Sequence, residues 1–126
     1  MTSRLMVLLA CLVGWAGAAS AEGDPVKGEK IFKKCMACHS TEAGKHRIGP
    51  SLAGVIGRQA GTAEGYKYSK AMKAYGDSGV VWTAEVMEPY LIKPREVVKG
   101  TKMTFPGLKK EDERADVIAY VMQFSE

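Results

Sequence analysis

The sequence KKCMACHS, residues 33–40, contains two cysteines separated by two residues, with a histidine directly after the second. Such a pattern serves a dithiol redox centre, part of a zinc site or the covalent attachment of a haem. A redox dithiol would follow a strand in a βαβ unit, and no strand pattern precedes Cys35. A structural zinc site needs four ligands, and His46 is the only further candidate after Cys38 and His39. The pattern therefore favours haem attachment.

The N-terminal residues predict export. Arg4 precedes an apolar run that ends in the small-x-small sequence Ala19-Ser20-Ala21, as in a secretory signal peptide. We expect residues 1–21 to form this signal peptide and residues 22–126 to form one domain, with an uncleaved N-terminal anchor as the alternative. Cleavage would leave 17 basic and 14 acidic residues and only two cysteines. In an oxidising compartment, such a pair forms a disulfide, a redox site or a cofactor tether.

Helical patterns are clearest at the two ends of the mature chain. EDERADVIAYVMQF, residues 111–124, has acidic residues in its first turn and apolar residues at positions i, i+4 and i+7. This pattern predicts a helix with one buried face. Near the other end, Asp24 is suited to cap a helix over residues 25–38, with Pro25 at the first helical position.

The middle of the chain is rich in glycine and shows little periodicity. Residues 40–80 therefore read as extended loops, with one short helix near residues 68–75. Thr83 can cap a further helix that Pro94 stops, and Pro89 should kink it. Because no run alternates as a strand for long, we expect an all-α fold. One disulfide could not order so much loop, whereas a large apolar cofactor could supply a core for it.

The possible functions of a haem protein differ in whether a side chain fills the iron position opposite the histidine. An open position indicates gas binding or peroxide chemistry, and a filled one indicates electron transfer. Met36 lies within the attachment turn, and Met87 and Met122 lie in predicted helices, where methionine usually fills a core. Met103 lies in KGTKMTFPG, a glycine-bounded loop able to reach the opposite haem face. Met103 is therefore the best candidate, with Met72 second.

Several motifs, in this order, resemble the class I cytochromes c of the bacterial cytochrome c2 type and are similar also to mitochondrial cytochrome c. They are Gly28 and Phe32 ahead of CMACH, GPSLAGVIGR at residues 49–58, GYKYS at residues 65–69, Trp82, TKMTF at residues 101–105 and RADVIAY at residues 114–120. The resemblance covers essentially the whole mature region. It implies a small single-domain cytochrome c fold with long loops wrapped around one covalent haem c.

The same resemblance assigns roles to nine residues. It implies thioether bonds at Cys35 and Cys38, with His39 as the proximal iron ligand and Met103 as the distal one. Further haem-binding residues are Pro50 at the imidazole N–H, Arg58, Tyr68 and Trp82 around the propionates, and Tyr90 beside the methionine sulfur. Donors are needed at the propionates because an unpaired buried carboxylate is very costly.

Other matching residues have structural roles in this reading. Gly28 and Phe32 would cross Val117 and Tyr120, with the glycine permitting the two terminal helices to approach closely. His46 would tie a loop. The chain also departs from the family pattern, since Lys99 stands where the mitochondrial type usually has proline and three extra residues precede the matching tryptophan.

The resemblance implies a soluble periplasmic one-electron carrier rather than an enzyme, and we expect a monomer. Its partners would be membrane or periplasmic redox proteins that dock at a lysine-rich haem edge, and not nucleic acid. The basic residues near this edge are Lys30, Lys33, Lys34, Lys93, Lys99, Lys102 and Lys110, with Arg95. The alternatives are an enzyme or gas-binding protein with an open iron, and an electron-entry subunit bound permanently to one dehydrogenase.

Overall fold

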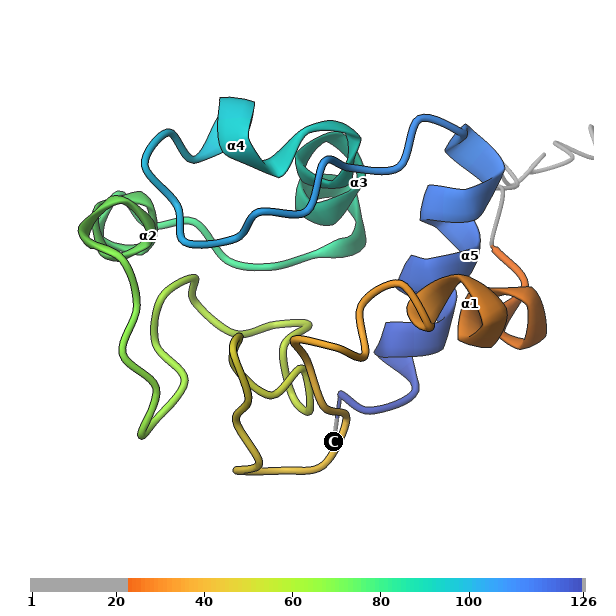
Figure 1. Cartoon of the computed structure of the whole chain (residues 1–126), viewed down its shortest axis with the longest axis horizontal. Helices are drawn as coiled ribbons and strands as arrows, with labels where there is room; N and C mark the ends of the chain where they lie inside the picture. The colour runs from red at the N-terminus through yellow and green to blue at the C-terminus, as the bar shows by residue number, and fades with distance from the viewer. Residues whose placement is uncertain (1–22, 126) are drawn as a thin grey trace, which may run out of the picture.

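The computed structural model describes residues 23–125, and the signal peptide expected over residues 1–21 lies outside them. This part of the chain contains five helices joined by long loops (Figure 1). In chain order they are α1 (Pro25–Phe32), α2 (Lys70–Asp77), α3 (Ala84–Ile92), α4 (Pro94–Val97) and α5 (Glu111–Met122). Within residues 23–125 the only β pairing is one antiparallel bridge between Gln59 and Val81. None of these helices has the length and apolar character needed to cross a bilayer. The all-α expectation is confirmed.

Helices α1 and α5 cross at one end of the molecule (Figure 1). The backbone N–H of Asp24, the N-cap of α1, donates to a carboxylate oxygen of Asp116 at 2.7 Å. A Cβ atom at Gly28 would overlap the backbone carbonyl of Asp116, so only glycine allows this approach. The rings of Phe32 and Tyr120 pack with their centroids 5.1 Å apart. The crossing predicted for the terminal helices is confirmed.

The helix expected over residues 25–38 is too long, because α1 ends at Phe32. The following residues form consecutive turns instead. The backbone N–H of Cys38 donates to the carbonyl of Cys35 at 3.1 Å, and that of His39 donates to the same carbonyl at 2.9 Å. Bonds that span three residues tighten the chain relative to an α-helix, and side-chain periodicity does not reveal this.

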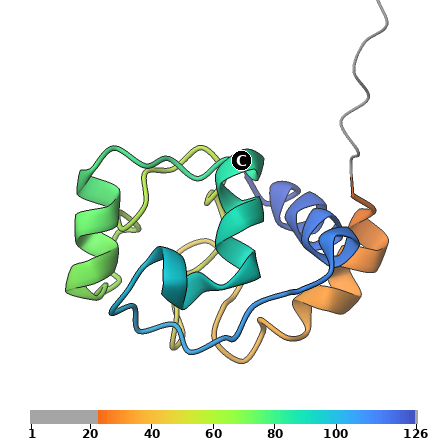
Figure 2. The same ribbon diagram turned by 90° about the horizontal axis from the view of Figure 1, so that it is seen from above.

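Residues 40–80 are loops interrupted only by α2 within the described chain, as expected. The short helix begins at Lys70 rather than at Tyr68, because the side chain of Ser69 caps it by accepting from the backbone N–H of Met72 at 3.0 Å. Gly76 lies so close to Ala60 that a Cβ atom would overlap the Ala60 carbonyl. Figure 2 shows α2 at the opposite end of the molecule from α1 and α5.

Helix α3 begins after Thr83, whose hydroxyl accepts from the backbone N–H of Val86 at 3.2 Å, as expected. Pro89 lies inside the helix, which continues to Ile92. Pro94 ends α3 as predicted, but it also opens α4, since proline suits the first position of a helix.

Arg114, whose role no local sequence pattern indicates, joins α5 to two other parts of the chain. Its side chain is buried, with 7% of the residue exposed. Its Nε donates to the carboxylate of Glu88 on α3, and its Nη1 donates to the carbonyls of Leu108 and Lys109, each at 2.9 Å. These bonds hold the segment that follows Met103 against the two helices.

Candidate functional site

A cavity of about 290 Å³ is lined by residues from α1, α2, α3, α5 and the intervening loops. This volume is near the lower end of the roughly 300–1,000 Å³ range of ligand pockets. All the candidate site residues line it: Cys35, Cys38, His39, Pro50, Arg58, Tyr68, Trp82, Tyr90 and Met103. Its walls include buried apolar side chains of Phe32, Val55, Val117, Ile118 and Val121. The structure therefore brings together residues that lie far apart in the sequence.

The imidazole ring of His39 is held in one orientation. Its Nδ1 lies 2.8 Å from the carbonyl oxygen of Pro50. Because a carbonyl only accepts, Nδ1 must carry the hydrogen, and Nε2 is left with a free lone pair. Burial lowers the pKa of His39, although the bond to Pro50 opposes this effect. The ring is therefore neutral and suited to ligate a metal through Nε2.

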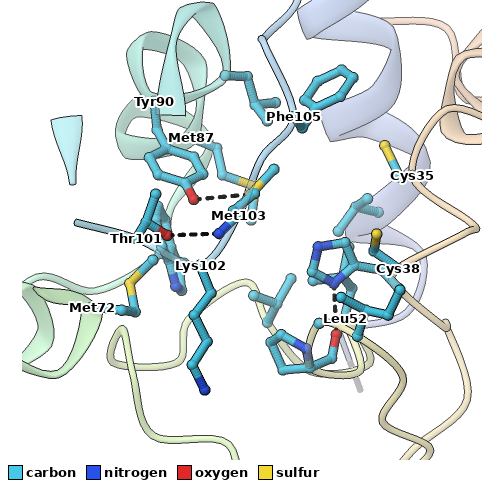
Figure 3. A pocket seen from close by; sticks show the side chains of 18 of the residues that line it. Cys35, Cys38, Leu52, Met72, Met87, Tyr90, Thr101, Lys102, Met103 and Phe105 are labelled. Atoms are coloured by element: carbon cyan, nitrogen blue, oxygen red, sulfur yellow. Dashed lines mark hydrogen bonds between the residues drawn. The ribbon is translucent and has the colours of Figure 1, made fainter. Parts of the chain in front are cut away.

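Cys35 and Cys38 are free thiols on the same side of the cavity (Figure 3). Burial, together with the neighbouring Cys38, raises the pKa of the Cys35 thiol to about 11, although Lys34 opposes this effect. A dithiol redox centre requires a lowered thiol pKa, because the thiolate is the nucleophile. This environment does not favour dithiol exchange.

The thioether of Met103 lies across the cavity from the two cysteines (Figure 3). Tyr90 of α3 donates its hydroxyl hydrogen to the Met103 sulfur at 3.2 Å. The backbone N–H of Met103 donates to the Thr101 hydroxyl, also at 3.2 Å. Burial raises the pKa of Tyr90 to about 12, so its hydroxyl remains a hydrogen-bond donor at neutral pH. Met103 is thus held by hydrogen bonds at both its side chain and its backbone.

The other methionines differ in their surroundings. Met72 and Met87 line the cavity beside Met103, and Met87 is buried as expected for a core residue. Met122 is 49% exposed, so the expectation that it fills the core is wrong. It lies in the last turn of α5, where the preceding residue, Val121, is the one that faces the core.

Three polar side chains that the resemblance placed near carboxylates line the same cavity. Arg58 donates from Nη1 to the carbonyl of Ala53 at 3.2 Å and from Nη2 to that of Ser51 at 3.3 Å. The Tyr68 hydroxyl accepts from the backbone N–H of Ala63 at 3.0 Å, which leaves its own hydrogen free to donate. The Trp82 ring packs edge-on against Tyr90, with centroids 4.8 Å apart. No aspartate or glutamate is among the described residues that line the cavity. The cavity is therefore suited to anionic groups.

His46 has the structural role expected of it. The backbone N–H of Ser51 donates to its Nδ1 at 3.0 Å, and its Nε2 donates to the carbonyl of Glu64 at 2.7 Å. Both ring nitrogens are thus used to join two loops. Among residues 23–125 no group of three or more histidine, cysteine and acidic side chains is arranged to hold a metal ion. The zinc interpretation gains no support from this geometry.

The donor set and the walls of the cavity fit a haem. Two thiols on one side suit the two attachment points of a porphyrin edge. An imidazole nitrogen and a thioether sulfur are both ligands of haem iron. The apolar walls suit the faces of the ring, and Arg58, Tyr68 and Trp82 supply N–H and O–H groups for its carboxylates.

Comparisons with known proteins agree with this geometry. The family model "Cytochrome c" matches residues 25–125. Cytochrome c from Ginkgo biloba is 48% identical over 103 residues, which cover 80% of this chain and 88% of the relative. Cytochrome c2 from Rhodomicrobium vannielii is 44% identical over 119 residues, covering 94% and 92%. The structure of cytochrome c2 from Rhodospirillum centenum superimposes with a TM-score of 0.78 at 45% identity, covering 82% of this chain and all of that one. The chain therefore belongs to the cytochrome c family, whose members carry electrons on a covalently bound haem c.

Proposed function

We propose that this protein is an exported one-electron carrier in which Cys35 and Cys38 hold the haem covalently and His39 and Met103 ligate its iron. The observation that carries the proposal is that hydrogen bonds hold both donor groups, one from His39 to the carbonyl of Pro50 and one from Tyr90 to the sulfur of Met103. When bound, the haem supplies an iron that gains and loses a single electron. His39 and Met103 would hold this iron through the imidazole Nε2 and the thioether sulfur in both oxidation states.

An iron whose two ligand positions beyond the porphyrin are both taken by side chains would distinguish an electron carrier from an enzyme. With His39 and Met103 both on the iron, a substrate or gas has no position to occupy. A thioether opposite an imidazole favours ferrous iron relative to two imidazoles, so we expect a raised reduction potential. The buried apolar walls exclude water from the site, which favours the same result because the ferric state carries more charge.

The residue pattern of the N-terminal segment supports export to the periplasm. Residues 1–21 have the pattern of a secretory signal, and covalent haem attachment of this kind takes place after export. We propose that the mature protein is soluble and docks through the cationic surface around the cavity mouth, where Lys34 and Lys102 line the opening. Cationic charge steers encounter with acidic redox partners.

The test is a pair of variants of the holoprotein. Met103→Ala should remain folded with bound haem, lose the sulfur-to-iron charge-transfer absorption, show a lower potential and bind added imidazole. An unchanged spectrum and potential would identify another ligand, with Met72 the nearest candidate. Cys35→Ala combined with Cys38→Ala should leave a largely unfolded chain, because the cofactor forms the core. A well-folded apoprotein by circular dichroism would contradict this.

The two alternatives make different predictions for the wild type. An enzyme or gas-binding protein with an open iron would lack the charge-transfer absorption in the ferric state. A subunit bound permanently to one dehydrogenase would elute with that dehydrogenase on gel filtration. A carrier should elute as a monomer and exchange electrons with more than one partner.

A further inference from the structure

The arginine side chains within residues 23–125 share one use, because each of them donates to a main-chain carbonyl. They are Arg47, Arg58, Arg95 and Arg114. Arg58 is half-buried and Arg114 is buried, whereas Arg47 and Arg95 are exposed. A guanidinium is suited to this use, since it presents several N–H donors in a rigid plane. The two exposed arginines therefore fix parts of the backbone in addition to adding surface charge.

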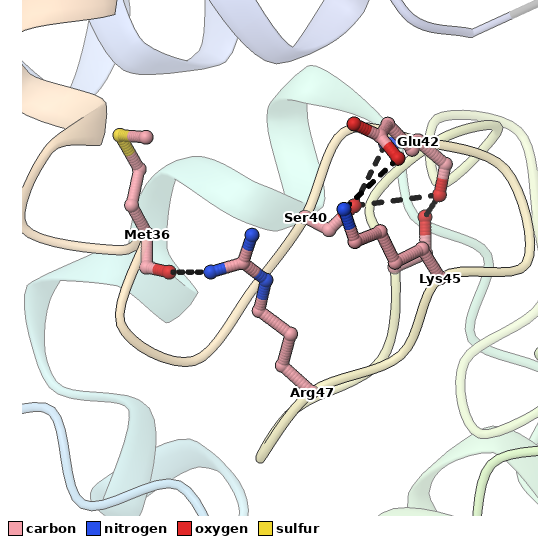
Figure 4. Close-up of polar contacts among 6 residues, drawn as sticks. Met36, Ser40, Glu42, Lys45 and Arg47 are labelled. Atoms are coloured by element: carbon pink, nitrogen blue, oxygen red, sulfur yellow. Dashed lines mark hydrogen bonds and ion pairs between the residues drawn. The ribbon is translucent and has the colours of Figure 1, made fainter.

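Arg47 holds the turn that carries the two cysteines. Its Nη1 donates to the carbonyl of Met36 at 3.2 Å, and Met36 lies between Cys35 and Cys38 in the chain (Figure 4). When the haem is bound, thioether bonds at the two cysteines would hold the same turn covalently. Loss of the Arg47 bond should therefore leave the haem ligands in place.

Arg95 reaches the segment that carries Met103. Its Nη2 donates to the carbonyl of Thr104, the residue directly after Met103, at 3.0 Å. Residues 98–110 form neither a helix nor a strand, so the position of this segment depends on bonds to other parts of the chain. Segments with little regular structure open at a lower free energy than packed helices do. A covalent link to the haem is not available to Met103, in contrast to the two cysteines.

Helix α4 gives Arg95 a fixed starting point. Pro94, at the first position of the helix, has a fully buried side chain, and Val98, directly after the helix, is 3% exposed. The backbone N–H of Val98 donates to the carbonyl of Pro94 at 2.9 Å. These two buried residues hold the short helix on both sides of Arg95. The bond from Arg95 therefore connects the carbonyl of Thr104 to an anchored part of the chain.

The far end of the same segment is anchored separately. The backbone N–H of Leu108 donates to the carbonyl of Leu91 on α3 at 2.7 Å. Arg114 holds the carbonyls of Leu108 and Lys109 against α5. Release of Met103 from an iron can leave these bonds in place. A movement of the residues around Met103, however, has to break the bond between α4 and the carbonyl that follows Met103.

We propose that Arg95 is a positioning residue that holds the Met103 segment against α4 and thereby sets how readily the sulfur leaves the iron. The inference rests on the proposed function, because it takes Met103 as an iron ligand. A small external ligand binds the iron only after the sulfur has left, so its apparent affinity is proportional to the fraction of molecules in which the sulfur has left. Loss of the Arg95 bond destabilises the closed form and raises that fraction.

The test measures the affinity of the ferric holoprotein for added imidazole by absorption spectroscopy. Arg95→Gln should raise this affinity about fivefold, which is the change expected from the loss of one net hydrogen bond. Arg47→Gln is the matched control, because it removes an exposed arginine with the same charge and the same kind of bond to a carbonyl. Its imidazole affinity should equal that of the wild type.

A second pair of variants shows whether the effect acts through Met103. In Met103→Ala the iron position is already open, so the addition of Arg95→Gln should leave the imidazole affinity unchanged. The effects of the two substitutions are then strongly non-additive, as expected for residues that act on the same step. A fivefold rise in both backgrounds would overturn the inference, because the effect would then not depend on release of the sulfur.

The remaining outcomes separate the inference from the proposed function. Equal imidazole affinities in the wild type and Arg95→Gln would overturn the inference, provided that both bind more weakly than Met103→Ala, and would leave the proposed function intact. An equal rise in Arg47→Gln and Arg95→Gln would also overturn it, since loss of a surface charge would then be sufficient. A wild type that binds imidazole as tightly as Met103→Ala would contradict the proposed function itself, because Met103 would then not occupy the iron.

Discussion

The hydroxyl of Tyr90 donates to the sulfur of Met103 at 3.2 Å, although the two residues lie 13 positions apart and belong to different segments. Tyr90 is carried by α3, whereas Met103 lies in the irregular segment that joins α4 to α5. The bond therefore ties the thioether to a helix of the core. Its electronic effect follows from chemistry, since a donor bound to sulfur withdraws electron density from it.

Removing this hydrogen bond should lower the reduction potential. In Tyr90→Phe the sulfur donates more strongly to iron, which stabilises the ferric state. A net hydrogen bond contributes about 0.5–1.5 kcal/mol, and 59 mV corresponds to a tenfold change for one electron, so we expect a fall of roughly 20–60 mV. Voltammetry of the holoprotein measures it. Tyr75→Phe, which removes a hydroxyl from another tyrosine that packs on Trp82, should leave the potential unchanged.

Alkaline stability should depend on the same tyrosine. Burial raises the pKa of Tyr90 from 10 to about 12, so between these values the unfolded chain loses its phenolic proton while the folded chain keeps it. The contribution of Tyr90 to stability is therefore fully present below pH 10 and is lost as the pH rises toward 12, by at most about 1.4 kcal/mol per pH unit. Urea unfolding across this range should show a shallower decline for Tyr90→Phe. Identical declines in the two proteins would contradict the assignment.

Gly49 should control the orientation of His39. A Cβ atom at Gly49 would lie 2.8 Å from Nδ1 of His39, which is already bonded to Pro50. Gly49→Ala should therefore displace the ring, weaken its bond to iron and destabilise the protein by about 1–3 kcal/mol. The measurements are the ferric absorption spectrum, the affinity for added imidazole and urea unfolding.

Gly44→Ala provides the control for this substitution. Gly44 has a φ of 70° and open space around it, so alanine there should cost about 1–2 kcal/mol through backbone strain alone. Its spectrum and imidazole affinity should match the wild type. If both variants change only stability, Gly49 has no specific effect on the ligand.

The crossing of α1 and α5 should tolerate no side chain at Gly28. Alanine there would overlap the Asp116 carbonyl, and the resulting separation of the helices should cost about 1–3 kcal/mol or more. Lys27→Ala, at an exposed position of the same helix, should be nearly neutral. Urea unfolding of the two holoproteins tests this. The reduction potential of Gly28→Ala should stay near the wild-type value, because Gly28 does not line the cavity.

Local sequence signals predicted much of the architecture correctly. The caps at Asp24 and Thr83 mark the starts of two helices, because cap chemistry acts over two or three residues. Two boundaries were less accurate. The end of α1 at Phe32 and the start of α2 at Lys70 both differ from the predicted positions, since turns and a serine cap replace the regular pattern there.

The sequence by itself determined the chemistry of this protein, because CMACH and a methionine in an irregular loop carry their meaning in residue type and spacing. Only the tertiary structure decided how those groups are held. The bonds from Tyr90 to Met103, from His39 to Pro50 and from Arg114 to Glu88 join residues from separate segments. No local pattern encodes such pairs, because they depend on where the loops and helices pack around the cavity.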